Sequence, residues 1–167
     1  MIQAKQNYNK KKPKIQFFTE IPRFRQLKTA ISINNLELSL INCVKQSQIP
    51  RLIQIIPITN ERIRTLNQKY RNKDQVTDVL SFSYQNSDQI FQQLNISTAN
   101  EIFLAPDFIK QQSLKHKQSF ADLTIRVIIH GLMHVCGYTH NHSQDFHQMQ
   151  KVEKYMLKSY YNLYSGD

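Results

Sequence analysis

Three histidines at the spacing of a metal site are the part of this 167-residue chain with the clearest chemistry. His130, His134 and His140 form the pattern HxxxHxxGxxH. Because residues four apart on an α-helix share a face, His130 and His134 can bind the same ion. His140 can join them only if the helix ends and the chain turns back. Gly137 permits that turn, since glycine adopts the left-handed C-cap conformation without a Cβ penalty, and the pattern therefore predicts three nitrogen ligands for one metal ion.

The chemistry of such a site depends on what surrounds these ligands. Three protein ligands leave a fourth position open, as in catalytic zinc sites, whereas structural sites are closed by four. A structural site remains an alternative, with Cys136, His142 or His147 as the fourth ligand. Gly131 stands where peptidases of the HExxH type carry their glutamate base. A peptidase would therefore need a base from elsewhere, and the pattern favours a Lewis acid and hydroxide source without an adjacent carboxylate.

Composition limits the class of protein and the kind of partner. The net charge is +10, with 22 Lys and Arg against 12 Asp and Glu. This excess favours a polyanionic partner, although a basic surface that only serves solubility is the alternative. The two cysteines, Cys43 and Cys136, do not make a disulfide framework and favour a reducing compartment. No apolar run reaches the length of a membrane span, so we expect no membrane association.

We expect one domain over residues 14–167, preceded by a mobile basic arm at residues 1–13. The expected location is cytoplasmic, and the basic arm leaves an organellar one open. The helix expected at 120–136 carries the first two histidines and is apolar over most of its circumference, which indicates a buried position. The order of elements predicts an α+β domain with a mixed sheet of about four strands packed against this metal-bearing helix. The other expected elements are strands at 14–20, 51–58, 78–84 and 101–105, helices at 34–46, after Thr59 and after Ser143, a basic connection at 23–33 and a loop at 85–99.

Local signals predict how two of these helices begin and pack. Asn34 is the expected N-cap of the first, with Glu37 in the capping-box position. Ile63, Leu66 and Tyr70 repeat at helical spacing in the helix that Thr59 caps. The spacing predicts that these three side chains form its buried stripe.

A basic cluster forms a second candidate site. Lys69, Arg71 and Lys73 lie within five residues, between an expected helix and an expected strand. A solvated basic turn is the plain alternative. A metal site acting on a phosphodiester would need a fixed guanidinium nearby, because the planar donor group of arginine suits phosphate. Arg71 is the candidate for that role.

Two segments of the chain resemble those of the YbeY family, bacterial zinc-dependent endoribonucleases that mature ribosomal RNA. The family pattern HGxLHLxGYDH is similar to HGLMHVCGYTH at 130–140, and LNxxYRxKDxPTDVLSF is similar to LNQKYRNKDQVTDVLSF at 66–82. The resemblance spans about residues 51–140. Thr139 stands where the family has Asp, Val76 where it has Pro, and Asn100-Glu101 where it has Gly-Asp. None of these departures removes a histidine or Arg71.

The resemblance implies a compact zincin-like α+β domain that holds one Zn²⁺ ion on His130, His134 and His140. It also implies that Arg71 acts beside the metal, and we expect Lys69 and Lys73 to contact RNA. The implied activity is cleavage of single-stranded RNA, in 3′-end maturation of 16S ribosomal RNA and in ribosome quality control. Ribosomal RNA of the small ribosomal subunit is the implied partner. The alternatives are a ribosome-assembly protein with a structural zinc and a zinc peptidase.

Overall fold

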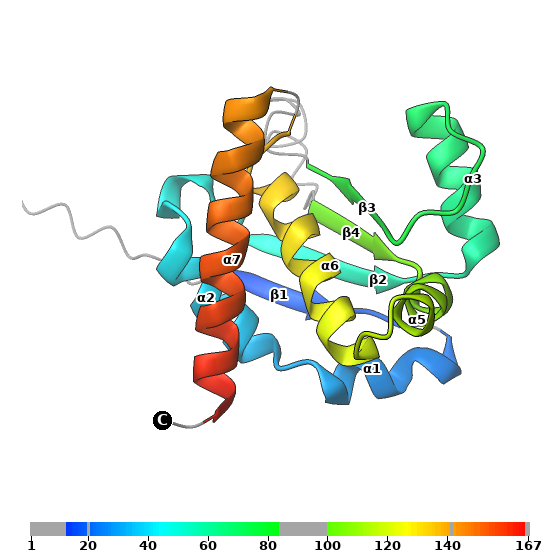
Figure 1. Cartoon of the computed structure of the whole chain (residues 1–167), viewed down its shortest axis with the longest axis horizontal. Coiled ribbons are helices and arrows are strands. Elements are labelled where there is room, and N and C mark those ends of the chain that lie inside the picture. Colours follow the sequence, from blue (N-terminus) through cyan, green and yellow to red (C-terminus); the bar gives the residue numbers. More distant parts are fainter. Residues whose placement is uncertain (1–12, 20, 84–99, 141, 166–167) are drawn as a thin grey trace, which may run out of the picture.

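A mixed β-sheet forms one layer of the molecule (Figure 1). The computed structural model describes residues 13–19, 21–83, 100–140 and 142–165. Within these residues the sheet has four strands, in the spatial order β1 (Lys14–Phe17), β2 (Leu52–Pro57), β4 (Asn100–Leu104) and β3 (Val79–Phe82). The first three are parallel, and β3 pairs with β4 in antiparallel fashion. The predicted sheet of about four strands is confirmed.

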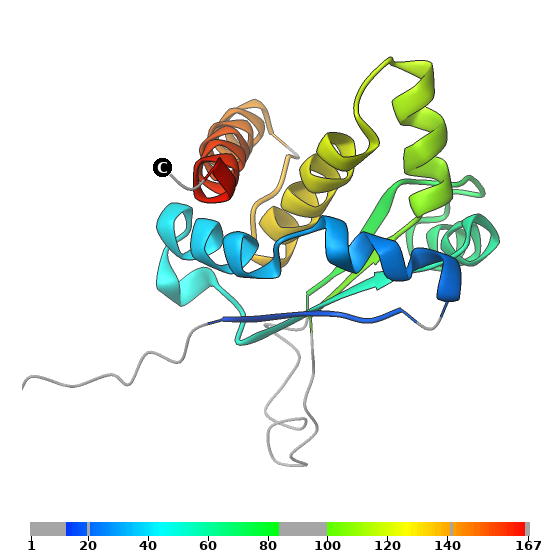
Figure 2. The same cartoon turned by 90° about the horizontal axis from the view of Figure 1, so that it is seen from below.

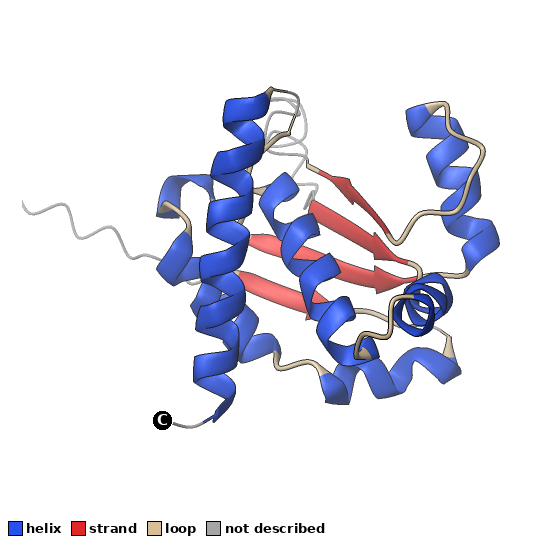
Figure 3. Cartoon of the chain, in the orientation of Figure 1, coloured by secondary structure: helices blue, strands red, loops and turns tan. Residues whose placement is uncertain are grey.

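Helices cover the sheet and make the domain an α+β structure, as predicted (Figure 3). They are α1 (Arg25–Ala30), α2 (Ile33–Cys43), α3 (Asn60–Arg71), α5 (Pro106–Lys115), α6 (Phe120–Val135) and α7 (Ser143–Ser165). The helices α1, α2, α6 and α7 lie on one face of the sheet, and the main core fills the space between (Figure 2). A smaller core cluster around Ile63, Leu80 and Ala105 joins α3 to β3. Among the described residues, no helix combines the length and the apolar character that crossing a bilayer requires.

The predicted helix starts are partly right. The Thr59 hydroxyl accepts a hydrogen bond from the Arg62 amide at 3.3 Å, which confirms the cap of α3. The prediction for α2 is wrong, because Ser32 caps this helix instead of Asn34. Glu37 is not part of a capping box either, since its carboxylate accepts a hydrogen bond from the Ile15 amide at 2.7 Å and ties α2 to β1. A tertiary contact has replaced the local one.

Other differences have similar causes. The expected connection at 23–33 contains α1, because Phe24 and Leu27 bury their side chains in the main core. The stripe of α3 is buried at Ile63 but not at Tyr70, which is 55% exposed because it lies in the last turn, at the margin of the smaller cluster. The expected arm at 1–13 and the expected loop at 85–99 lie outside the described residues, apart from the buried Pro13.

Gly131 sets how closely the metal-bearing helix approaches the sheet. A Cβ atom at this position would lie 2.8 Å from Cγ2 of Ile102 and 3.1 Å from Oγ of Ser81. Ile102 is fully buried and has no free space to move into. Only glycine therefore lets α6 lie at this distance from β3 and β4, and this distance fixes where the neighbouring His130 stands.

We expect Gly131→Val to lower the free energy of unfolding by roughly 1–3 kcal/mol, the usual cost of overpacking a filled core. Urea denaturation measures the change. Ala121→Val on the exposed side of the same helix is the matched control and should change stability by less than about 0.5 kcal/mol. Equal stability of the two variants would show that α6 does not need this close approach.

Candidate metal centre

The turn after α6 brings the third histidine back to the other two. Gly137 has φ +88°, and no atom lies near the space that a Cβ would occupy. Its amide donates to the His134 carbonyl at 3.0 Å, and the Tyr138 amide donates to the Met133 carbonyl at 3.0 Å. These two bonds form a Schellman motif, which ends the helix after Val135 and reverses the chain. The predicted role of Gly137 is confirmed.

The three predicted histidines meet in space. The ring centres of His130 and His134 are 4.6 Å apart, and those of His134 and His140 are 5.0 Å apart. Each residue offers one nitrogen, and these nitrogens all lie within 4.8 Å of one another. Two of the rings are half-buried, and His140 is exposed. The site is therefore built on a rigid helix and opens to solvent on the side of the turn.

The residues considered as a fourth ligand do not join this group. Among the described residues, no further histidine, cysteine, aspartate or glutamate comes within the same reach. Cys136 is buried in the main core, and burial raises the pKa of its thiol to about 12. His142 and His147 are exposed near the start of α7. The described residues thus supply three ligands and leave one side open, as in catalytic sites.

In two of the three rings, those of His130 and His134, a hydrogen bond at Nδ1 orients the ring so that Nε2 points toward the other ligand nitrogens. Nδ1 of His130 lies 2.8 Å from Oε1 of Glu153, and Nδ1 of His134 lies 3.1 Å from the Tyr138 carbonyl. Because a carboxylate and a carbonyl only accept hydrogen bonds, each Nδ1 must be the donor, which leaves Nε2 as the nitrogen that can bind a metal. The two Nε2 atoms face each other at 3.1 Å.

This arrangement fits a bound cation. A metal ion held between the two Nε2 atoms would be bound by the lone pairs of both rings. Two nitrogens bonded to one tetrahedral zinc ion at ~2.0–2.1 Å would be about 3.3 Å apart, close to the observed 3.1 Å. The donor set, its spacing and its outer hydrogen bonds therefore match a site for a divalent transition metal.

The protonation of His134 also suits a ligand. Burial lowers its pKa to about 4, and the neighbouring His130 and His140 act in the same direction. The hydrogen bond that Nδ1 donates to the Tyr138 carbonyl opposes this shift, and the charge of Arg71 makes the smallest contribution in its favour. Since protonation begins only well below neutral pH, the ring is neutral at pH 7, the form that binds a metal.

The basic cluster surrounds the end of α3. Arg71 is the last residue of that helix and is exposed, and no carboxylate among the described residues forms an ion pair with it. Lys69 and Lys73 are also exposed, and no described contact joins either to the histidines. All three basic residues therefore lie exposed around the end of α3.

Several polar residues of the same sequence segment hold this end of α3 in place. The side-chain amide of Asn67 donates to the Gln75 carbonyl at 2.8 Å, and Asn67 is buried. Arg64 makes two hydrogen bonds to the Asp74 carboxylate, at 2.6 and 2.8 Å. These contacts fasten the loop after α3 to the helix and so position Arg71. Sequence reasoning identified the cationic residues of this segment and missed the supporting ones.

Glu153 is the functional residue that the sequence did not reveal. It lies on α7, 23 positions after His130. Along α7 it directly follows Val152, which packs against the main core, and it is half-buried itself. A glutamate directly after a residue of the apolar stripe is the signal that the sequence offers, and it does not say which partner the carboxylate reaches.

We expect Glu153→Ala to weaken metal binding by roughly 10- to 100-fold, because loss of an outer hydrogen bond frees the ring and lowers its basicity. Competition with a chromogenic chelator measures the affinity without reference to activity. Asp107→Ala is the matched control, since this carboxylate pairs with Arg23 at 2.7 Å on the exposed surface, through residues that are not part of the metal site. Unchanged affinity in the Glu153 variant would remove this residue from the metal site.

A carboxylate also lies near the position where the chain departs from the family pattern. The Thr139 hydroxyl is 3.4 Å from Oδ2 of Asp145, in the first turn of α7. The turn before His140 therefore contacts the carboxylate of Asp145, although position 139 is a threonine and not an aspartate.

Fold and site together define an α+β protein whose three clustered histidines could hold a metal ion with one coordination position open. The family model of Endoribonuclease YbeY matches residues 11–161. The chain therefore belongs to the YbeY endoribonuclease family, a family of hydrolytic enzymes.

Curated relatives and a solved structure are similar to this chain. Endoribonuclease YbeY of Neorickettsia sennetsu is 36% identical over 104 residues, which cover 62% of this chain and 69% of that protein. Endoribonuclease YbeY of Aliarcobacter butzleri is 32% identical over 110 residues, 64% of this chain and 75% of that protein. The solution structure of TM1509 from Thermotoga maritima superposes with a TM-score of 0.54 at 23% identity, over 92% of this chain and 96% of the other. That likeness supports the fold.

Proposed function

We propose that this protein is a zinc-dependent endoribonuclease that cleaves single-stranded RNA. The observation that carries the proposal is the pair of Nε2 atoms of His130 and His134, which face each other at 3.1 Å next to His140 and within the electrostatic reach of Arg71. The family and its curated relatives support an RNA substrate. The net charge of +10 favours a polyanion.

Each residue of the site has a distinct task in this proposal. Bound zinc would supply a Lewis acid and lower the pKa of a coordinated water towards ~7. Glu153 and the Tyr138 carbonyl hold the imidazoles in the ligating orientation. Arg71 binds the scissile phosphate and neutralises the charge that develops on its oxygens.

The proposed substrate is ribosomal RNA of the small subunit, and the proposed roles are 3′-end maturation of 16S ribosomal RNA and ribosome quality control in the cytoplasm. Membership of the family supports these roles. The lysines around the end of α3 would bind flanking phosphates, so affinity for RNA should fall as salt rises, because phosphate contacts release counterions.

Two competing functions account less well for the site. In a zinc peptidase of the HExxH type, the residue after the first histidine carries the base, but a side chain at Gly131 would point at Ile102 in the sheet. A ribosome-assembly protein with a structural zinc would have a closed ion, whereas the group contains three described ligands and its third one, His140, is exposed.

One experiment separates these readings. Purified protein is incubated with a panel of single-stranded RNAs and unstructured peptides, with chelator, without it, and after zinc is restored. We expect RNA cleavage that stops with chelator and returns with zinc, and intact peptides. Peptide cleavage would favour a protease, and intact RNA under every condition would favour the assembly protein. A precursor 16S fragment with a 3′ extension then tests the proposed natural substrate.

A further inference from the structure

An exposed aromatic pair lies at the end of α3. Tyr70 is 55% exposed, and its ring centre is 5.1 Å from that of Phe82 at an interplanar angle of 74°. Phe82 in turn lies 5.8 Å from Phe103, again edge to face, and so continues into the smaller core cluster. Tyr70 thus has one side held by packing while more than half of its surface stays open. An aromatic ring that is both fixed and open is suited to stacking against a flat apolar ligand.

This aromatic pair is linked to the metal centre by one hydrogen bond and by its position along the chain. Phe82 ends β3, and the hydroxyl of the next residue, Ser83, lies 3.5 Å from the Val135 carbonyl at the end of α6. Val135 directly follows His134. On the other side, Tyr70 directly precedes Arg71, the residue to which we assign the scissile phosphate. Phe82 is thus joined through Ser83 to the end of the helix that carries two of the histidines, and Tyr70 adjoins the proposed phosphate contact.

The positively charged residues around the aromatic pair indicate which class of ligand it binds. The ammonium group of Lys69 lies 5.1 Å from the ring centre of Tyr70, and Arg71 and Lys73 are exposed close by in the sequence. A flat apolar group bordered by several cations matches an unpaired base between two phosphates. It does not match an apolar protein partner, for which charged residues would be depleted at the centre of the contact.

We infer that Tyr70 and Phe82 form a stacking platform for an unpaired base next to the scissile phosphate. The inference rests on the proposed RNA cleavage and adds how the strand is held. The base stacks on the exposed ring of Tyr70 in place of the Lys69 ammonium, Phe82 holds the ring through its edge-to-face contact, and the adjoining phosphate reaches Arg71. The platform binds a base that is not already stacked within a duplex, and it therefore favours single-stranded over duplex RNA.

Cleavage kinetics on a short single-stranded RNA test the platform. We expect Tyr70→Ala to lower kcat/KM about 5- to 150-fold, the equivalent of ~1–3 kcal/mol for one stacked base, while metal content is unchanged. Tyr70→Phe keeps the ring and should retain activity. Tyr70→Leu keeps an apolar contact with Phe82 but lacks a π face, so it should lose activity like the alanine variant even if Tyr70→Ala proves unstable.

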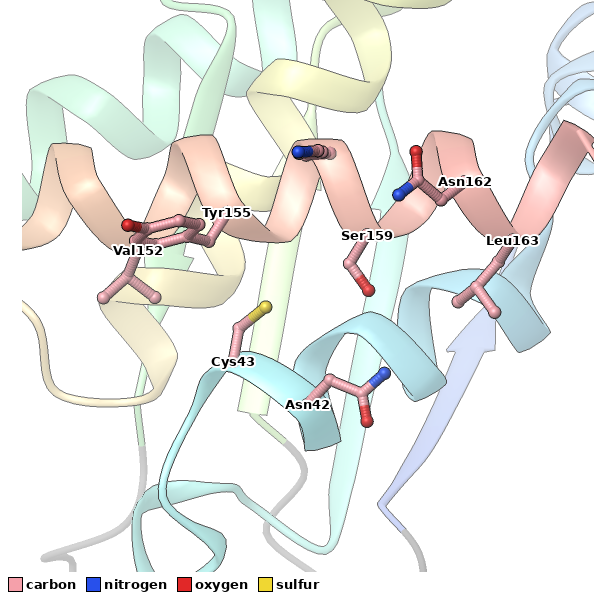
Figure 4. Close-up of a pocket in the computed structure, with 8 residues that line it drawn as sticks. Asn42, Cys43, Val152, Tyr155, Ser159, Asn162 and Leu163 are labelled. Carbon is pink, nitrogen blue, oxygen red and sulfur yellow. The ribbon is translucent and has the colours of Figure 1, made fainter. Parts of the chain in front are cut away.

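Tyr155→Ala is the matched control. Tyr155 is 57% exposed, almost the same as Tyr70, but it lines a groove of about 490 Å³ between α2 and α7, together with Cys43 and Val152 (Figure 4). None of the three histidines lines this groove. Its loss should leave cleavage and metal content as in the unsubstituted protein.

A second readout separates stacking from a merely structural role. The RNA is prepared as a series in which one nucleotide at a time lacks its base. In the unsubstituted protein, we expect one abasic position near the cleaved bond to lower kcat/KM, and in Tyr70→Leu the same abasic position should have no further effect. An equal loss in both proteins, or full activity of Tyr70→Leu, would overturn the platform. RNA left intact by the unsubstituted protein would instead overturn the proposed nuclease function itself.

Discussion

We expect that replacing His134 with alanine will remove the bound metal and reduce RNA cleavage to the background of the assay. His134 is the central ligand, because its Nε2 atom faces that of His130 at 3.1 Å and its ring lies next to His140. With two ligands left, one of them exposed, the site no longer encloses an ion on three sides. Among single substitutions in this chain, we expect this loss of activity to be the largest.

The His134→Ala experiment needs metal analysis, a melting curve and a cleavage assay on the same preparation. We expect less than stoichiometric metal, and a melting temperature close to that of the metal-stripped unsubstituted protein. His147→Ala is the matched control, since His147 lies outside the ligand group and is exposed on α7. It should keep both metal and activity. A His134 variant that retains its metal and cleaves RNA at the normal rate would refute the proposed ligand set.

The second large effect concerns Arg71. We expect Arg71→Ala to lower kcat roughly 10²- to 10³-fold, the usual effect of removing one donor that stabilises charge in a transition state. Metal content should stay the same, because Arg71 is not a ligand and its positive charge lowers the pKa of His134 without contacting the metal group. Arg71→Lys should recover only part of the rate, since an ammonium group lacks the two parallel donors of a guanidinium.

The control for Arg71 comes from the same helix. Arg62 lies in the first turn of α3, is exposed and carries the same charge. If overall charge alone mattered, Arg62→Ala and Arg71→Ala would slow cleavage equally and their difference would vanish at high salt. We expect a small, salt-dependent effect for Arg62 and a large one for Arg71 that persists in salt. Full activity of Arg71→Ala would exclude the proposed contact with the phosphate.

The ligand set could be predicted from the sequence because its geometry is local. Two histidines four residues apart must share a helix face, and a glycine three positions later can end that helix. The structure adds only the details of the turn, namely the φ of +88° at Gly137 and the two bonds of the Schellman motif. Thr59 at the start of α3 is predictable for the same reason, since its cap involves an amide three residues away.

The parts that sequence reasoning missed depend on contacts between distant segments. Glu153 reaches a ring 23 residues earlier, and Glu37 binds an amide 22 residues earlier instead of its own helix start. Tyr70 has helical spacing with Ile63, yet it is exposed at the margin of the sheet, where its ring packs edge to face against Phe82. A pattern along one helix shows which residues share a face, but not what lies opposite that face.

Stepwise restoration of zinc to metal-stripped protein, with RNA cleavage followed at each step, tests the central claim most directly. We expect cleavage to be absent without metal, to rise in proportion to the zinc bound, and to level off at one ion per chain. Metal-stripped protein that cleaves RNA as fast as the reloaded protein would contradict the account, as would zinc that binds at one ion per chain and leaves cleavage absent.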